Sequence, residues 1–367
     1  MKRSFLTCLG LMFTIAPAII SSTSAAGEIL NPFKKLSTKN NVSHKSKYQT
    51  LYFEDDFLPQ GSNPDPCFSK KLTCARTPSA FSVEACPDEL KTDHLKDLNK
   101  CIWTVYGGYN TWDENKKVAF LPQNIRIENG ILELTFAKNP GYDPTSSKLC
   151  GDSDGGTPSF RNTNCEFAGA GLFTKYKTKD RQGVNFLYGR VEILARIETD
   201  EGGVAALWAW PDVPNKGWPY QTKSAHATYS DKGKLLWAQN GEIDILESYS
   251  DKKSDFRKVS QSYHNWVVGS TVAPGEGHSW DTNHASVRYD EGWHWYGVET
   301  HPDKIIFTVD DEYTSIVKNG GRAKSGFKKI HHLINDAASY LIISLNSRSL
   351  DPKVNERLLI DKVRFYK

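Results

Sequence analysis

Three carboxylates lie within six residues of one another in a stretch that has the composition of a β-strand, 240–248. Side chains alternate between the two faces of a strand, so Glu242 and Asp244 share one face and the isoleucines between them occupy the other. Glu247 stands an odd step from Glu242, and on a flat strand its charge would point into the core, which is costly. One extra residue near Ile245–Leu246, a β-bulge, would return Glu247 to the face of the other acids. The pattern therefore predicts three carboxylates on one concave surface.

Acids this close titrate as a coupled set, in which neighbours favour the protonated form of at least one member. Such a set suits glycoside hydrolysis, where one carboxylate attacks the anomeric carbon and another donates a proton to the leaving oxygen. A pair of carboxyl groups about 5–5.5 Å apart gives retention of configuration. A solvated acidic strand edge and a calcium site are two other interpretations. No glycine-centred loop of about twelve residues surrounds the acids, which disfavours calcium.

The run from Glu242 to Glu247, Glu-Ile-Asp-Ile-Leu-Glu, resembles the signature of glycoside hydrolase family 16. It resembles the version with a bulge residue, which is typical of laminarinase-like, agarase and carrageenase members. The lichenase-like version is one residue shorter. The resemblance implies that Glu242 is the nucleophile, Glu247 the general acid/base, and Asp244 an assisting residue between them. Strand geometry alone does not assign these roles.

The start of the chain has the pattern of an export signal. Residues 1–26 combine Lys2 and Arg3 with an apolar stretch and small residues at 24–26, and a polar leader follows at 27–47. Removing Lys2 and Arg3 from the 46 basic residues leaves 44 against 43 acids. A near-neutral chain has no bulk electrostatic reason to bind nucleic acid or an anionic membrane. We therefore expect a secreted protein, extracellular or periplasmic, that is a monomer with a saccharide as its partner.

Cysteine usage agrees with export. After removal of the signal, which contains Cys8, six cysteines remain, and an even number predicts three disulfides. Fifteen pairings are open. Zinc is the competing interpretation, but no Cys-x-x-Cys spacing occurs. Four of the six lie in an insertion at about 58–101, where 88–99 has a helical pattern. The six are Cys67, Cys74, Cys86, Cys101, Cys150 and Cys165.

The remainder of the region 48–367 predicts an all-β domain. Short runs rich in Val, Ile, Tyr and Phe alternate with Gly/Asn/Asp turns, as at 125–136 with a turn at 128–130. This pattern predicts two antiparallel sheets packed face to face. The sequence lacks the repeated βα alternation that is typical of a parallel sheet. The family resemblance implies a two-sheet antiparallel β-jelly-roll sandwich of the concanavalin type, with a curved inner sheet that forms the substrate cleft.

The same resemblance places three further residues beside the sugar. Trp208 and Trp237 match positions that face the substrate, and an indole stacks well on the apolar face of a pyranose. His264, on the strand after the acids, matches a position beside the carboxylates, although a histidine in an aromatic strand is often structural. His294 matches a structural position.

The reaction itself requires no cofactor. The resemblance also implies a structural calcium ion at the convex side, with ligands from Glu54 or Asp55, Gly130 and Asp361. The leading hypothesis is a retaining endo-glycosidase that cuts a β-linked polysaccharide, most simply a β-1,3-glucan. Alternatives are an agarase- or carrageenase-like β-galactan hydrolase, a transglycosylase, and a non-catalytic carbohydrate-binding protein on the same fold.

Overall fold

The computed structural model describes the chain in segments, and all of them belong to the compact unit formed by residues 36–367. The described segments are 46–58, 67–75, 84–86, 92–106, 108–109, 118–147, 150, 164–174, 184–199, 203–211, 228–229, 235–236, 241–248, 258–266, 278–288, 292–318, 338–347 and 355–367. The predicted export signal and residues 27–45 of the leader lie outside them. No helix among the described residues is long and apolar enough to cross a membrane.

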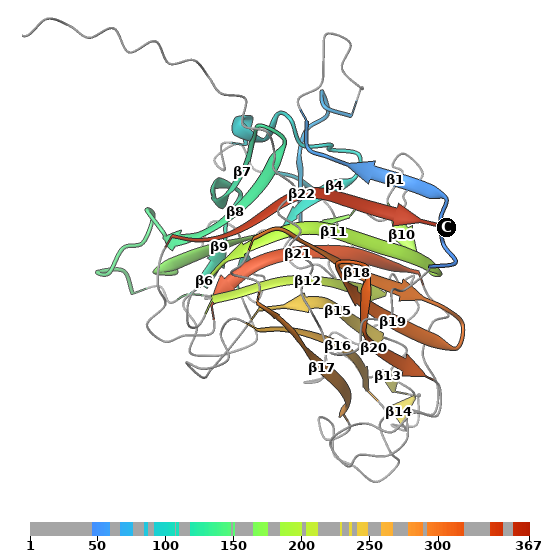
Figure 1. Ribbon diagram of the computed structural model, residues 1–367. Helices are drawn as coiled ribbons and strands as arrows, with labels where there is room; N and C mark the ends of the chain where they lie inside the picture. Colours follow the sequence, from blue (N-terminus) through green and yellow to red (C-terminus); the bar gives the residue numbers. More distant parts are fainter. Residues whose placement is uncertain are drawn as a thin grey trace, which may run out of the picture. The chain divides into compact units, whose positions relative to one another are not determined.

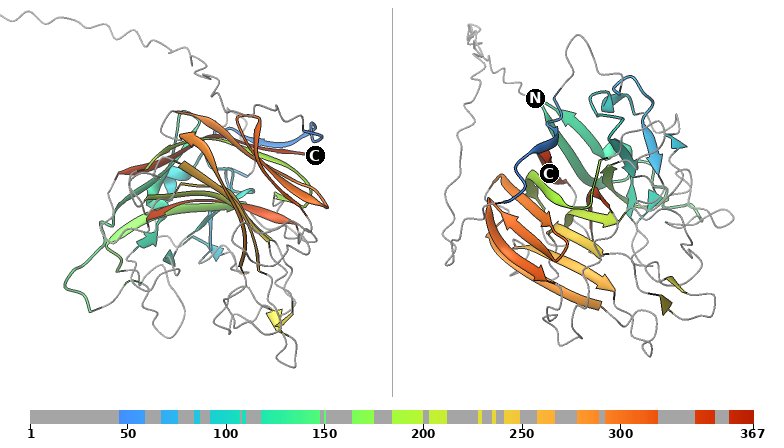
Figure 2. Two further views of the ribbon diagram at one scale, coloured as in Figure 1. Left: turned by 60° about the horizontal axis from the view of Figure 1, so that its bottom comes forward. Right: turned by 90° about the vertical axis from the view of Figure 1, so that its right-hand side faces the viewer.

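Two layers of strands make up the unit (Figures 1 and 2). The outer layer runs in the order β7 (Ile125–Glu128), β8 (Ile131–Lys138), β22 (Glu356–Tyr366), β11 (Gly189–Glu198), β18 (His294–Thr300), β19 (Lys304–Val309) and β20 (Glu312–Lys318). The first strand, β1 (Leu51–Asp55), pairs with the end of β22. All of these pairings are antiparallel, as the turn-rich sequence predicts.

The inner layer contains the acidic strand. Its order is β3 (Glu84–Ala85), β2 (Thr73–Ala75), β4 (Trp103–Tyr106), β9 (Phe167–Thr174), β21 (Ser339–Ser347), β12 (Gly203–Pro211), β15 (Gly241–Glu247), β16 (Lys258–Trp266) and β17 (His278–Arg288). Figure 1 shows β12, β15, β16 and β17 side by side. Among these described pairings, β2 runs parallel to β4 and the others are antiparallel.

Short elements complete the described structure. β5 (Gly108–Tyr109) pairs with β6 (Val118–Phe120), which runs parallel to β9. β10 (Asn185–Phe186) pairs with β21, and β13 (Thr228–Tyr229) pairs with β14 (Leu235–Leu236). The layers are joined where β8 pairs with β9. The 3₁₀ turns are η2 (Asp93–Leu95) and η3 (Pro122–Asn124).

One hydrophobic core fills the space between the layers. On β11, Val191, Ile193 and Ala195 alternate with outward-facing residues and are fully buried. Leu207 and Ala209 of β12 are buried in the same cluster. Burial follows a period of two on β8 of the outer layer, whereas β4, β9 and β21 of the inner layer are buried on both faces. Covering the apolar faces that the two layers turn toward each other drives the sheets together. The predicted antiparallel two-sheet fold is confirmed.

Local turn chemistry explains two hairpins of the outer layer. The β7–β8 turn consists of Asn129 and Gly130, both with positive φ, at 53° and 78°. The β19–β20 turn consists of Asp310 and Asp311, at 50° and 64°. Two central residues of positive φ match the right-handed twist of the flanking strands, and Asn, Asp and Gly tolerate this conformation best. The hairpin predicted at 125–136 is therefore confirmed.

The cysteines pair locally as three disulfides, Cys67–Cys101, Cys74–Cys86 and Cys150–Cys165. The helix predicted at 88–99 is wrong for its described part, because 92–99 contains only the 3₁₀ turn η2. Leu95 at the end of that turn and Leu98 just after it are already buried, at 0% exposure each. The chain then extends into β4, which begins at Trp103 shortly after Cys101, so tertiary structure overrides helix propensity.

Candidate active site

The predicted bulge is present in β15. On the β12 side, Leu207 pairs with Leu246, and the next residue, Trp208, pairs with Asp244. On the β16 side the pairing also shifts by one residue between Asp244 and Glu247. β15 therefore contains one residue more than each of its neighbours over this stretch, and Ile245 is the extra one against β12.

Burial along β15 shows the consequence of the bulge. Ile243, Ile245 and Leu246 are all buried in the core between the sheets, at 2%, 0% and 0% exposure. Two consecutive residues, Ile245 and Leu246, thus enter the core, which a flat strand does not permit. Glu242 and Glu247, on either side of this run, are each half-buried. The bulge thus places Glu242 and Glu247 on the same face of β15 despite their odd spacing, as the sequence predicts.

Asp244 lies between the two glutamates and is 2% exposed. Its Oδ2 accepts a hydrogen bond of 2.8 Å from the hydroxyl of Ser262, which stands directly opposite on β16 and is 1% exposed. A buried carboxylate requires such donors because it has lost its hydration. Sequence reasoning missed Ser262, since the identity of the residue opposite Asp244 depends on strand pairing.

The end of the acidic strand is tied to β12 by Ser248. Its N–H donates to the carbonyl of Ala205 at 2.9 Å, and its hydroxyl accepts from the N–H of Ala205 at 3.1 Å. Ser248 is 1% exposed, so these bonds are shielded from water. Beside this anchor, Ala206 pairs with Glu247 on one side and Ser344 on the other. The side chain that stands beside Glu247 on β12 is therefore small.

Trp208 faces the same side of the inner sheet as Asp244, its partner across the strand pair. The half-buried indole donates its N–H toward the Ser344 hydroxyl at 3.4 Å and meets Trp210 edge to face, with ring centroids 5.9 Å apart. It packs on an apolar cluster of the same face, formed by Tyr106, Phe120, Phe173, Trp210, Tyr340 and Ile342. The predicted sugar-stacking residue therefore has a packed support and lies next to the acids.

Comparisons with known proteins agree with this geometry. No model of a known protein family matches the sequence. A curated relative, the β-glucanase of Rhodothermus marinus, is 26% identical over 289 residues, which are 76% of this chain and 83% of that protein. The solved laminarinase catalytic domain of Thermotoga maritima has a TM-score of 0.52 at 18% identity, covering 88% of this chain and 99% of its own. A non-specific endo-β-1,3(4)-glucanase of glycoside hydrolase family 16, co-crystallised with 1,3-β-D-cellotriosyl-glucose, also gives 0.52 at 18% identity, covering 88% of this chain and 96% of its own.

The chain is thus similar to a β-glucanase in sequence and to a laminarinase and a glucanase of glycoside hydrolase family 16 in fold. It shares the jelly-roll fold of these solved structures. For His264, which the family resemblance places at the substrate, the structure describes the backbone position. The backbone of His264 pairs with that of Glu242, so the histidine belongs to the strand position expected beside the acids. Trp237 lies outside the described residues.

Two of the residues expected to bind calcium, Glu54 and Asp55, make contacts within the protein. The Glu54 carboxylate accepts from Arg364 Nε at 2.5 Å. Asp55 accepts from the Trp103 indole N–H at 2.7 Å and from the Phe57 N–H at 3.0 Å, and burial raises the pKa of Asp55. Both carboxylates thus have protein partners, and their role as calcium ligands stays a prediction. No group of three or more His, Cys, Asp or Glu residues suited to a metal occurs within the described segments.

The two other expected calcium ligands also remain predictions. Gly130 sits in the β7–β8 turn, close to the backbone carbonyl of Asp56. Asp361 is half-buried, and burial raises its pKa, with Asp56 among the charges that act on it. Gly130 and Asp361 therefore share a neighbour in Asp56, which the sequence did not single out.

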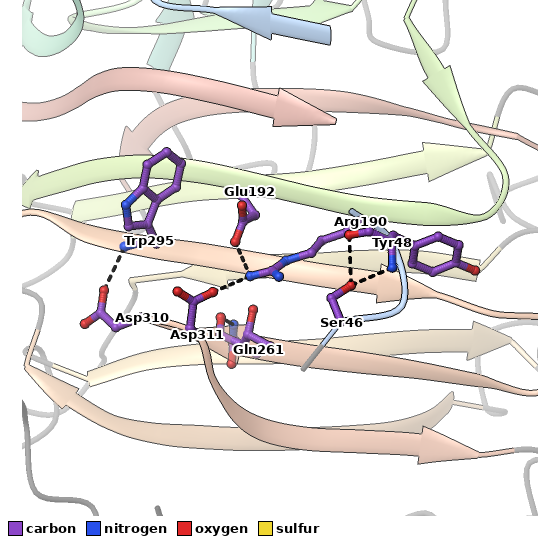
Figure 3. A network of polar contacts seen from close by, with 9 residues as sticks. Ser46, Tyr48, Arg190, Glu192, Gln261, Trp295, Asp310 and Asp311 are labelled. Atoms are coloured by element: carbon purple, nitrogen blue, oxygen red, sulfur yellow. Dashed lines mark hydrogen bonds and ion pairs between the residues drawn. The ribbon is translucent and has the colours of Figure 1, made fainter. Parts of the chain in front are cut away.

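The outer face carries an ion-pair network that the family resemblance did not assign (Figure 3). Arg190 donates to Glu192 on its own strand and to Asp311 in the β19–β20 turn. In the same turn, Asp310 pairs with His294 Nδ1 at 2.8 Å and accepts from the Trp295 N–H at 2.9 Å. His294 is buried at 6% exposure, in agreement with its predicted structural role. These contacts fix the turn against β11 and β18.

Proposed function

We propose that this protein is a secreted, retaining endo-glycosidase whose substrate is a β-1,3-glucan of the laminarin type. Its coarser activity, hydrolysis of β-glucans, follows from its relatives. The observation that supports the retaining mechanism is the bulge in β15, which gives Glu242 and Glu247 one common face with Asp244 between them, and the choice of a β-1,3-glucan is supported by the similarity to laminarinases. Acids in this arrangement can approach a single sugar ring from one side.

In the proposed mechanism, Glu242 attacks the anomeric carbon and forms a covalent glycosyl-enzyme, while Glu247 protonates the oxygen of the departing saccharide. Glu247, now ionised, then removes a proton from water, and the water oxygen displaces Glu242 from the sugar. Asp244 is held by Ser262 between the two groups and adds a fixed negative charge next to both. Trp208 supplies a flat apolar surface for a neighbouring sugar ring.

Substitution of each glutamate tests the roles. Glu242→Gln and Glu247→Gln should each lower kcat on laminarin by at least about 1,000-fold while binding of laminarin oligosaccharides persists. Glu128→Gln is the matched control, because its carboxylate is exposed on the outer hairpin, with 60% of the side chain accessible. NMR of the first product should show the β-anomer. Binding and cleavage that both survive Glu242→Gln would rule out this mechanism.

A substrate panel separates the proposal from its alternatives. Product sizes from laminarin, lichenan, agarose and carrageenan distinguish a β-glucanase from a β-galactan hydrolase. Products longer than the starting oligosaccharide indicate transglycosylation, and binding without cleavage indicates a carbohydrate-binding protein. Only cleavage of laminarin into short oligosaccharides supports the endo-β-1,3-glucanase.

The proposed location and state of the protein have their own tests. The export pattern of residues 1–26 and the three disulfides support secretion, because disulfides persist in oxidising compartments. Expression of the full chain with and without residues 1–26 tests export. Sedimentation of the purified protein tests the monomer. A fall in unfolding temperature on adding a chelator tests the proposed calcium ion near Gly130 and Asp361.

A further inference from the structure

A buried amide lies directly behind the acidic strand. Gln261 of β16 (Figure 3) is 0% exposed, and it points to the opposite side of its strand from Ser260 and Ser262. Its side-chain nitrogen donates to the carbonyl of Ile245 at 2.9 Å and to the carbonyl of Thr308 at 3.2 Å. Its side-chain oxygen accepts from the hydroxyl of Thr314. Both amide protons and the amide oxygen are thus in use, and these bonds fix which end of the amide carries the nitrogen.

The partners of Gln261 belong to two β-bulges, one in each sheet. Ile245 is the extra residue of β15 against β12. In the outer sheet, Phe307 pairs with Ser315 while the next residue, Thr308, pairs with Tyr313, which leaves Thr314 as the extra residue of β20. One side chain therefore bridges the irregular position of the inner sheet and that of the outer sheet.

The bond to Ile245 stabilises the bulged register against the flat one. A bulge interrupts the ladder, so backbone groups of the extra residue need partners elsewhere. The Ile245 carbonyl lies in the apolar core, where an acceptor without a donor is costly. Gln261 provides that donor. In a flat register every later side chain of β15 would change face, and Glu247 would point into the core.

We propose that Gln261 is a positioning residue for the reaction, which holds the β15 bulge and thereby the relative placement of Glu242 and Glu247. It acts through the backbone of Ile245, and it is separated from any substrate because it lies between the sheets. The outer sheet takes part, because Thr314 and Thr308 orient the amide. This inference rests on the proposed function, since it assigns a role to the spacing of the two glutamates.

The test is Gln261→Met, which keeps the length of the side chain and removes its hydrogen bonds. Val259→Ala is the matched control, since Val259 is 0% exposed, faces the same core from the same strand, and makes no contact of this kind. We expect kcat on laminarin to fall about 100-fold in Gln261→Met with KM within about twofold, because small misplacement of catalytic groups has effects of this size. The limbs of the pH profile of kcat should also move, because the coupling of the two acids depends on their spacing.

Val259→Ala should keep the wild-type pH profile and a kcat within about twofold, even if it unfolds at a similar urea concentration to Gln261→Met. Thr314→Val is a milder change that removes the partner of the amide oxygen, and it should shift kcat in the same direction. It is the variant to test if Gln261→Met fails to fold. A wild-type pH profile and kcat in Gln261→Met, or an equal loss in Val259→Ala, would overturn the inference.

Failure of the proposed function gives a different result. If the wild-type protein cleaves no glucan, the proposed function is wrong. Crystal structures of Gln261→Met or Thr314→Val then test the positioning role of Gln261 separately. A β15 that keeps the bulged pairing with β12 and β16 in the variant overturns that role. A β15 that loses the bulge, with Glu247 turned toward the core, supports it.

Discussion

Two serines of β16 allow the contact that holds Asp244 to be tested against a matched neighbour. Ser262 and Ser260 lie two residues apart, so they face the same side of the strand, and they are 1% and 5% exposed. The Ser262 hydroxyl donates to Asp244. The Ser260 hydroxyl has no hydrogen-bond partner in the part of the chain that the structure describes. Replacing either serine by alanine removes the same atom from the same strand, but only one replacement affects Asp244.

The structure gives different magnitudes for the two changes. The Ser262–Asp244 bond is 2.8 Å long and both groups are buried, so it should contribute as a hydrogen bond to a charged group. We expect Ser262→Ala to lower the free energy of unfolding by about 1.5–3 kcal/mol. Ser260→Ala removes a buried hydroxyl that has no such bond, and we expect a change within about 0.5 kcal/mol.

Urea unfolding followed by tryptophan fluorescence at pH 7 measures both changes, with the dependence on urea concentration compared between variants. Ser262→Thr keeps the hydroxyl and should recover most of the loss. Hydrolysis of laminarin, measured in parallel, should fall in Ser262→Ala and persist in Ser260→Ala. Equal destabilisation by the two alanine substitutions would refute the reasoning, because the cost would then come from the strand position and not from the bond to Asp244.

Three further predictions follow from single contacts. Trp208→Ala should raise KM for laminarin oligosaccharides by about tenfold or more, and Trp208→Phe by less, because a smaller ring keeps part of the stacking surface; steady-state kinetics measures both. Replacing Cys67 and Cys101 together by serine opens a loop closed by residues 34 apart and should lower the free energy of unfolding by about 4 kcal/mol, measured by urea unfolding. Burial raises the pKa of Asp55 above 3.8, so its folded form holds the proton to higher pH than the unfolded chain does. The stability that protonated Asp55 contributes is therefore complete below pH 3.8 and is lost as pH rises through the folded pKa. Asp55→Asn, which cannot ionise, should show a smaller fall in urea midpoint between pH 4 and pH 7 than the wild type.

Much of the fold could be predicted from local pattern. The alternation at 125–136 and the Asn129-Gly130 turn specify a hairpin because a turn of positive φ and the flanking period-two strands act over a few residues. Local pattern gave the wrong result at 88–99, because the described part of that predicted helix, 92–99, contains a single 3₁₀ turn. There the requirement to enter β4 in extended form outweighed a weak intrinsic preference.

The acids and their bulge could be read from one strand. The supports of the site could not, since Ser262, Ser248 and Gln261 are ordinary polar residues whose partners lie on other strands. The pairing of six cysteines was equally open, because a disulfide depends on which Cα atoms the fold brings together.

By itself, the sequence determined that β15 must carry an extra residue. Side-chain alternation is a property of each strand alone, and a charge out of phase with it is visible without any neighbour. The tertiary structure decided what keeps the extra residue in place. The donor to Ile245 comes from β16 and is oriented by Thr308 and Thr314 of the opposite sheet. Hydrogen bonds between strands distant in sequence arise only when the sheets form and pack, so no spacing in the chain reveals them.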